Sequence, residues 1–222
     1  MGGRQGWEAV QTSPSLFDGV IAGAPAFKLY AHIGFFGYVY ERLGVDVSNV
    51  TLAQWSAVQA QVLERCDSLD GAKDGILEAP ANCKLDWTQL VCDEDNDEDG
   101  HTNGNATTSI PSTCLTSDQV EKVSALFAPI LYNETLIHPG AHHSFEPVLI
   151  ATIYSDLVKT WLPEVFRYIV YSDIKWDPTT FTLSDVLYAL QTQAGGLSSF
   201  SVNISAFRDA GGKMLHWHGL AD

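Results

Sequence analysis

Basic residues are scarce in this 222-residue chain, which has 12 Lys and Arg against 27 Asp and Glu and a formal net charge of −15. A protein that binds duplex nucleic acid displaces counterions with clustered Lys and Arg, and the sequence has no such cluster. We therefore expect no nucleic-acid partner. Long hydrophobic runs are lacking as well: no apolar stretch reaches the roughly 18 residues of a membrane-spanning helix, so we expect no membrane partner. The acidic balance favours a secreted protein or one that binds cations.

An apolar leader is also lacking, because Met1 is followed by Gly-Gly-Arg-Gln. We therefore expect no signal peptide within this chain. Four Asn-x-Ser/Thr sequences nevertheless indicate secretion, since this pattern is the acceptor for N-glycosylation. The candidate glycosylation sites are Asn49, Asn105, Asn133 and Asn203.

Cysteine is limited to four residues, and none of them has the CxxC spacing of zinc or redox sites. Their number allows three pairings, and structural disulfides are the favoured interpretation in a secreted protein. The four are Cys66, Cys83, Cys92 and Cys114.

Short strands are predicted near both ends of the chain. Residues 20–22 are an apolar run between two glycines, which is typical of a strand buried on both faces, and residues 213–217 form the second strand. Residues 133–147 are predicted to be loop, and Pro163 predicts a kink or break in a helical stretch. Helices are predicted over 3–11, 27–42, 52–65, 116–127, 154–171, 183–193 and 204–210. The fold class is therefore α/β, with a mostly helical, cysteine-containing insertion between two strand units.

Three groups of residues suggest chemistry, and each has a simpler interpretation. Residues 2–6, Gly-Gly-Arg-Gln-Gly, begin a helix that follows a nucleophile elbow or merely a glycine-rich helix start. Residues 66–76 hold three aspartates and two Asp-Gly pairs, which suit the oxygen ligands of calcium or two solvated turns. Asp222 follows a His-Gly turn after the last strand and could orient a catalytic histidine or cap a helix.

His216 and His218 alternate along the same strand-like segment and point the same way. A metal pair is conceivable, but the segment offers no obvious further ligand. Packed or hydrogen-bonded histidines are the favoured interpretation.

Together these pieces resemble the tannase and feruloyl esterase family, whose members are secreted serine esterases of the α/β-hydrolase fold. The residues that carry the resemblance are 2–6, the run Phe-Asp-Gly-Val-Ile-Ala-Gly-Ala-Pro-Ala at 17–26, and Cys-Asp-x-x-Asp-Gly-x-x-Asp-Gly at 66–75. Cys-Leu-Thr-x-x-Gln at 114–119 and Gly-Gly-Lys-x-x-x-x-His-Gly-x-x-Asp at 211–222 complete it in order.

The resemblance implies a role for each of these segments. Asp222 aligns with the acid of a Ser-His-Asp triad, and the backbone N–H of Met1 is an oxyanion donor because the elbow serine comes immediately before it. The catalytic histidine follows Asp222, outside this chain. The aspartate loop is similar to a calcium site formed by side chains of Asp67, Asp70 and Asp74 and carbonyls of Ala72 and Ile76. Lid disulfides are implied for Cys66–Cys83 and Cys92–Cys114.

The resemblance also implies a division of the chain and an activity. Residues 1–40 and 203–222 belong to a partial α/β-hydrolase sheet, and residues 41–202 form a large, mostly helical, disulfide-rich lid. The activity is hydrolysis of feruloyl, galloyl or related aromatic esters, whether of small molecules or linked to polysaccharide. Without the serine and histidine, this chain alone is expected to be inactive. The alternative is a secreted, calcium-stabilised binding module without enzymatic activity.

Overall fold

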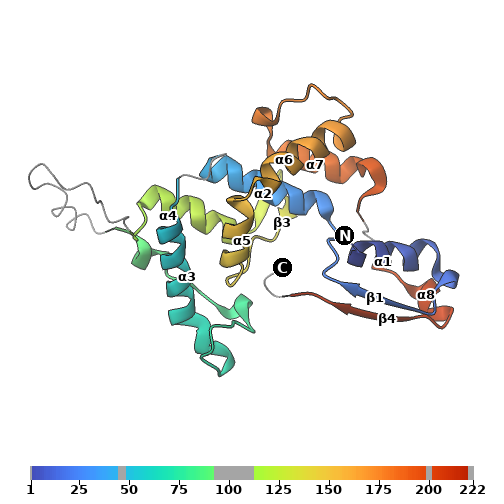
Figure 1. Ribbon diagram of the computed structural model, residues 1–222, viewed down its shortest axis with the longest axis horizontal. Coiled ribbons are helices and arrows are strands. Elements are labelled where there is room, and N and C mark those ends of the chain that lie inside the picture. The colour runs from blue at the N-terminus through green and yellow to red at the C-terminus, as the bar shows by residue number, and fades with distance from the viewer. Residues whose placement is uncertain (1, 45–48, 93–112, 199–201, 220–222) are drawn as a thin grey trace, which may run out of the picture.

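The computed structural model describes residues 2–44, 49–92, 113–198 and 202–219, in a smaller part and a larger one (Figure 1). The smaller part contains helix α1 (Gly2–Thr12), strand β1 (Gly19–Gly23), helix α8 (Ser205–Asp209) and strand β4 (Lys213–Trp217). The larger part is mostly helical. Arg4 of α1 links the two parts by donating a hydrogen bond to the carbonyl of Leu197.

The smaller part contains a two-stranded parallel sheet that joins the two ends of the chain. β1 pairs with β4 in a register that runs from Gly19 opposite Lys213 to Gly23 opposite Trp217. α1 lies on one face of β1, and a Cβ at Gly6 would come within 3.0 Å of Val20 Cγ1. Glycine therefore lets the helix pack closely on the strand.

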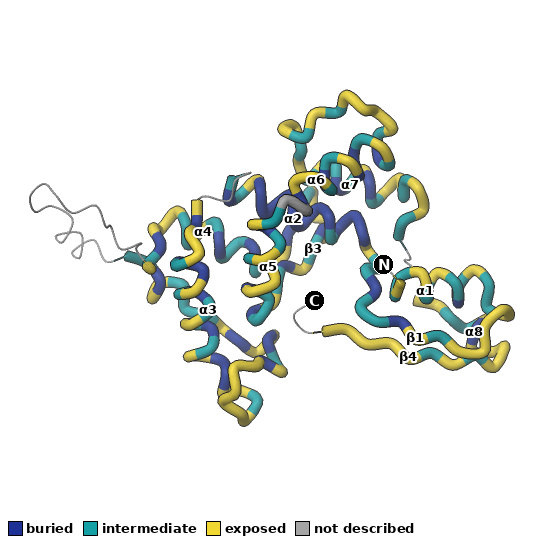
Figure 2. Tube along the Cα trace, in the orientation of Figure 1, coloured by how far each residue is buried: buried dark blue, intermediate teal, exposed yellow. Residues whose placement is uncertain are grey.

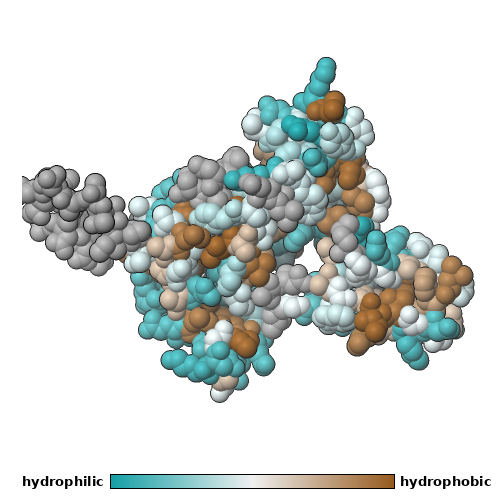
Figure 3. Space-filling view, viewed as in Figure 1, coloured by the Kyte–Doolittle hydropathy of each residue, from teal (hydrophilic) through white to brown (hydrophobic). Residues whose placement is uncertain are grey.

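The expectation that β1 is buried on both faces is wrong. Ala22 faces α1 and is fully buried, but Ile21 is 69% exposed, and its neighbours Leu215 and Trp217 on β4 are 60% and 54% exposed. Apolar residues also gather on the surface around β1 and β4 in Figure 3. Since side chains alternate along a strand, α1 covers only one face, and no described element covers the other.

The larger part is organised around helix α2 (Leu29–Leu43), most of whose side chains are buried (Figure 2). The α2 residues Ile33 and Leu43 belong to one hydrophobic core with Trp55, Leu126 and Val186 from the surrounding segments. The other helices of this part are α3 (Leu52–Cys66), α4 (Ser117–Ser124), α5 (Glu146–Ile153), α6 (Asp156–Glu164) and α7 (Leu183–Thr192). Short 3-10 segments span Pro14–Leu16, Asp67–Asp70, Pro80–Asn82, Trp87–Leu90, Ala125–Phe127, Pro178–Thr180 and Ala194–Gly196. The predicted division of the chain into a hydrolase core, residues 1–40 and 203–222, and a lid, residues 41–202, stays a prediction.

Several local signals produce the expected elements. The side chain of Thr116 accepts from the N–H of Gln119, and the Gln119 side chain accepts in return from the Thr116 N–H. This is the predicted capping box, and it begins α4. Pro163 lies inside α6, and a six-residue π-helical stretch, Val165–Val170, follows it. The proline removes one backbone donor, so the irregularity occurs where the sequence predicts it.

The predicted loop over residues 133–147 is wrong at both ends. β2 (Ile130–Tyr132) and β3 (Thr135–His138) form an antiparallel hairpin, and α5 begins at Glu146. Asn133 and Glu134 form the connection, with φ angles of 45° and 61°. A two-residue connection with both φ values positive is a favoured hairpin turn. Residues that resemble a loop in the sequence therefore form the turn between two paired strands.

Both disulfides implied by the resemblance are present, Cys66–Cys83 and Cys92–Cys114. The first closes the aspartate loop that follows α3 in the chain. There, Val62, Leu77 and the two cysteines form a small separate core. Across the described helices, none combines the length and the apolar character that a membrane crossing requires.

Candidate active site at the strand ends

The carboxyl ends of β1 and β4 lie side by side and are tied together as they leave the sheet. The N–H of Ala24 donates to the carbonyl of Trp217 over 2.9 Å. One residue further along each segment, Nε2 of His218 donates to the carbonyl of Pro25 over 3.2 Å. Ligand sites in open α/β sheets form beyond such strand ends. A ligand site is therefore expected at this edge of the sheet.

The beginning of α1 approaches the same strand ends. A Cβ on Gly3 would lie 2.1 Å from the carbonyl oxygen of Gly23, so only glycine permits this contact. The predicted elbow helix therefore starts at the carboxyl end of β1, as a nucleophile elbow requires. The oxyanion donor Met1 and the triad acid Asp222 lie outside the described residues, and their roles stay predictions.

His216 and His218 are brought together at this edge by packing and hydrogen bonding. The His216 ring makes edge contacts with Trp7 of α1 at 5.6 Å and with Phe27 at 5.8 Å between centroids. Its centroid lies 5.5 Å from that of His218. Within residues 2–44, 49–92, 113–198 and 202–219, no three His, Cys, Asp or Glu residues are grouped to hold a metal ion. The structure thus gives these histidines the packed and hydrogen-bonded roles favoured from the sequence.

A cavity of about 420 Å³ opens between the strand ends and the larger part of the molecule. One wall is formed by residues 24–28 after β1, with Ala31, His32 and His218 beside them. Another part of its lining is formed by Leu136, Ile137, His138 and Pro139 from β3 and its continuation. The cavity therefore lies between the strand unit that carries α1 and the hairpin of the helical part.

His138 is a polar residue of this cavity that the sequence reasoning missed. It ends β3 opposite Ile130, and its ring stacks on Phe35 of α2 at 4.6 Å between centroids. Burial lowers the pKa of His138 to about 4, and the nearby His32 and His142 lower it in the same direction. The short apolar runs at residues 130–132 and 136–137, on either side of Asn133-Glu134, could have revealed the hairpin, and with it this histidine.

The aspartate loop folds its carboxylates onto its own backbone. Asp67 is buried and accepts from the N–H of Gly75, whereas Asp70 accepts from the N–H groups of Ala72 and Glu78. These backbone hydrogen bonds lower the pKa of Asp70.

In the same loop, Asp74 accepts from the N–H of Ile76. Gly71 and Gly75 both have positive φ values, so the two Asp-Gly turns of the simpler interpretation are present. Oxygen donors of this kind suit calcium chemically, but among the described residues no three carboxylates converge on one point.

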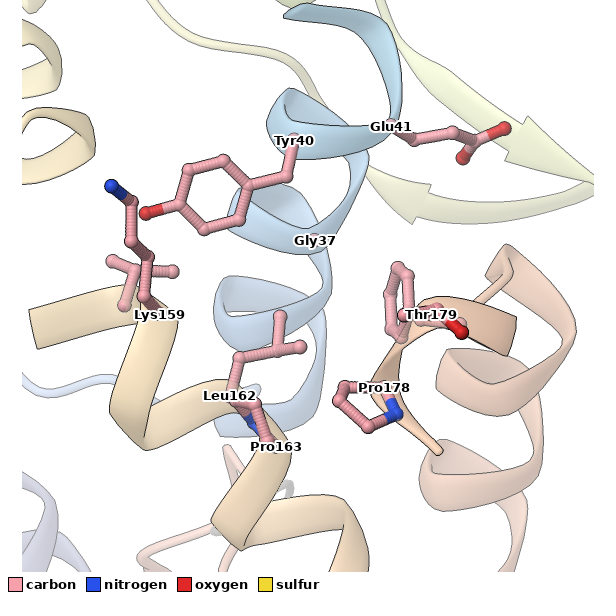
Figure 4. A pocket seen from close by; sticks show the side chains of 10 residues that line it. Gly37, Tyr40, Glu41, Lys159, Leu162, Pro163, Pro178 and Thr179 are labelled. Atoms are coloured by element: carbon pink, nitrogen blue, oxygen red, sulfur yellow. The ribbon is translucent and has the colours of Figure 1, made fainter. Parts of the chain in front are cut away.

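A second cavity, of about 310 Å³, lies within the larger part between α2, α6 and Pro178 (Figure 4). Figure 4 shows Tyr40, Leu162 and Pro178 around this space, with Lys159 at its edge. None of the residues that line it comes from the strand ends. It therefore belongs to the packing of the helices rather than to the strand-end site.

Of the predicted glycosylation sites, Asn49, Asn133 and Asn203 are exposed. Asn133 occupies the turn of the hairpin, and Asn105 lies outside the described residues. All four stay predictions.

The fold recurs in solved esterase structures. It superimposes on the crystal structure of feruloyl esterase B from Aspergillus oryzae with a TM-score of 0.83 and 35% identity, over 99% of this chain and 42% of that one. It also matches a tannin acyl hydrolase from Aspergillus niger with a TM-score of 0.73, over 99% of this chain and 42% of that one, where 17% identity indicates a shared fold alone. The family model described as "Tannase and feruloyl esterase" matches residues 1–222. The chain belongs to this family, and the predicted resemblance is confirmed.

Sequence relatives carry the same family name. The chain is 35% identical over its whole length to a probable feruloyl esterase B-1 of Aspergillus terreus, of which it covers 41%. It is 37% identical over its whole length to feruloyl esterase C of Talaromyces stipitatus, of which it covers 40%. The chain thus spans about two fifths of the length of these curated relatives.

Proposed function

We propose that the protein carrying this chain hydrolyses carboxylic esters of phenolic acids, such as feruloyl or galloyl esters. The observation that carries the proposal is the cavity between the ends of β1 and β4 and the hairpin strand β3. It lies where parallel sheets bind ligands, beside the helix whose Gly3 fits tightly against Gly23. The names of the relatives supply the substrate class.

The mechanism that fits this family is nucleophilic catalysis by a Ser-His-Asp triad. The serine precedes Met1 in the elbow pattern and attacks the ester carbonyl while the histidine accepts its proton. The backbone N–H of Met1 donates to the oxyanion of the tetrahedral intermediate. The histidine then protonates the leaving alcohol, and an acyl ester of the serine remains. The histidine next accepts a proton from the water that attacks this ester, and it returns the proton to the serine as the acid leaves. Asp222 holds the imidazole in the required tautomer and stabilises its positive charge.

The test uses the full-length gene product with methyl ferulate and methyl gallate as substrates. Asp222→Asn should lower kcat by about 10⁴-fold, because the histidine then takes the wrong tautomer. Asp209→Asn is the control, since Asp209 is an exposed residue of α8. An Asp222→Asn variant within tenfold of the wild type would contradict the triad assignment. The isolated 222-residue chain should show no turnover, and clear hydrolysis by it would contradict a serine and histidine outside the chain.

We also propose that the aspartate loop binds calcium through side chains of Asp67, Asp70 and Asp74 and carbonyls of Ala72 and Ile76. Its support is the all-oxygen donor set in a loop closed by the Cys66–Cys83 disulfide. Added calcium should raise the melting temperature of the EDTA-treated protein, because a ligand that binds only the native state stabilises it. Asp70→Asn should abolish this rise. Equal melting temperatures with calcium and with EDTA would exclude the site.

We also propose that the protein is secreted and N-glycosylated. Treatment of the natural secreted protein with a peptide N-glycosidase should lower its apparent mass. Absence of any ester hydrolysis, together with a melting temperature that depends on calcium, would favour the calcium-stabilised binding module instead.

A further inference from the structure

One polar side chain of the strand-end cavity has its hydrogen-bonding role set by the backbone. The N–H of Gly140 donates to Nδ1 of His138 over 3.1 Å. Nδ1 must therefore carry a lone pair, and in the neutral ring the proton lies on Nε2. His138 thus presents an N–H donor at Nε2, and no described residue accepts a hydrogen bond from it.

The backbone that holds His138 has little freedom to move. Gly140 has a φ of +89°, and a Cβ there would lie 2.6 Å from the carbonyl oxygen of Ala128. The next residue, Ala141, donates its N–H to the carbonyl of Leu126 over 2.8 Å. The ring itself stacks on the buried Phe35. These contacts fix the ring before any ligand arrives, which lowers the entropic cost of binding.

The ring also stays uncharged over the pH range in which a secreted esterase would work. Burial lowers the pKa of His138 to about 4, and the nearby His32 and His142 lower it in the same direction. A neutral donor binds a neutral oxygen acceptor such as a phenol or a methoxy group without burying a charge. The remaining walls of the cavity include Pro25, Phe27 and other apolar side chains, which suit an aromatic ring.

We propose that His138 is a specificity-determining residue for the acyl group, and that its Nε2–H donates to an oxygen substituent on the aromatic ring of that group. The proposal rests on the proposed esterase function and assigns to this cavity the class of ring-oxygenated cinnamoyl or benzoyl esters. The position of His138 favours a contact with the acyl group of the ester rather than with its alcohol group. It belongs to the part of the lining that comes from the hairpin, whereas the segment after β1, which forms another part, approaches the start of α1. A substrate whose acyl aromatic ring lies against β3 has its ester group toward the strand ends.

The test compares kcat/KM for methyl ferulate and methyl cinnamate, which differ only in the hydroxyl and methoxy substituents of the ring. A neutral hydrogen bond contributes about 0.5–1.5 kcal/mol net, so His138→Leu should reduce the ferulate-to-cinnamate ratio by up to about tenfold. His138→Gln keeps an N–H donor and should retain part of the ratio. His142→Leu is the matched control, because His142 is exposed and does not line the cavity. It should leave the ratio unchanged.

The outcomes separate this inference from the function on which it rests. Equal losses on both esters in His138→Leu would mean that the residue only supports packing, and the inference would fail. A change that follows the alcohol, seen by comparing methyl and arabinosyl ferulate, would also overturn the assignment to the acyl ring. If the wild-type protein hydrolyses neither ester, the proposed function fails, and calorimetric binding of ferulate and cinnamate still tests His138. Loss of the wild type's preference for ferulate in His138→Leu would support the inference, and an unchanged preference would refute it.

Discussion

The stability of this protein should depend on pH through His138, because this histidine is neutral in the folded state at pH values where it is charged when unfolded. Its pKa is lowered from 6.5 to about 4 by burial, with contributions from His32 and His142. Between these two values the unfolded chain binds a proton that the folded chain does not. The free energy of unfolding therefore rises with pH across this range and falls on acidification. Above about pH 6.5, His138 contributes no further change.

The magnitude follows from the same two values. A difference of about 2.5 pH units at about 1.4 kcal/mol each corresponds to a full cost of about 3 kcal/mol. At pH 4.5 the unfolded side chain is almost fully protonated and the folded one is mostly neutral. About 2.5 kcal/mol of stability should therefore be lost through this group between pH 7 and pH 4.5.

The assay is urea unfolding of the full-length gene product at pH 7 and pH 4.5, with wild type and His138→Gln compared. Glutamine does not titrate, so the variant should lose about 2 kcal/mol less than the wild type on acidification. His142→Gln should change the loss by much less than His138→Gln does, because His142 is exposed and makes only a smaller contribution to the lowered pKa of His138. If wild type and His138→Gln lose the same free energy of unfolding within about 0.5 kcal/mol, folding does not lower the pKa of His138 and the reasoning is refuted.

Three further predictions test the packing of the helical part. Replacing Cys66 and Cys83 by serine opens a 17-residue separation and should cost about 3 kcal/mol by the loop-entropy relation; an unchanged melting temperature would contradict it. Gly34→Ala would place a Cβ 2.6 Å from a methyl carbon of Val186 and should cost about 1–3 kcal/mol, part of which Val186→Ala should restore in a double-mutant cycle. Glu146→Ala removes a fully buried carboxylate that accepts from a histidine ring and a backbone N–H. Its cost should be about 2–4 kcal/mol in urea unfolding, and a loss below about 0.5 kcal/mol would refute this role.

Local sequence signals were enough to predict most elements of the fold, and they failed where the outcome depended on distant partners. The strand Lys213–Trp217 and the helix beginning after Thr116 have the predicted positions, because glycines and a capping box mark them. The burial of residues 20–22 was predicted wrongly, since a strand's sequence does not reveal which elements cover its two faces. The hairpin was missed because Asn133-Glu134 resembles an ordinary polar loop, although it forms a tight turn with positive φ at both positions.

The candidate site divides in the same way. Its location at the strand ends follows from the order of elements along the chain, and the glycines of residues 2–6 predict the close approach of α1. The cavity wall from β3 could not be predicted, because His138 meets Phe35 and the segment after β1 only through the packing of the helical part.

The two walls of the cavity therefore come from segments with different constraints. The segment after β1 is bound to the end of β4 by hydrogen bonds from Ala24 and His218, and a change there also disturbs α1 through Gly3. β3 is held by the hairpin and by α2 instead. Under the proposed function, substitutions on β3 should therefore alter the acyl preference without moving the strand ends, whereas substitutions in the segment after β1 should lower turnover for every ester.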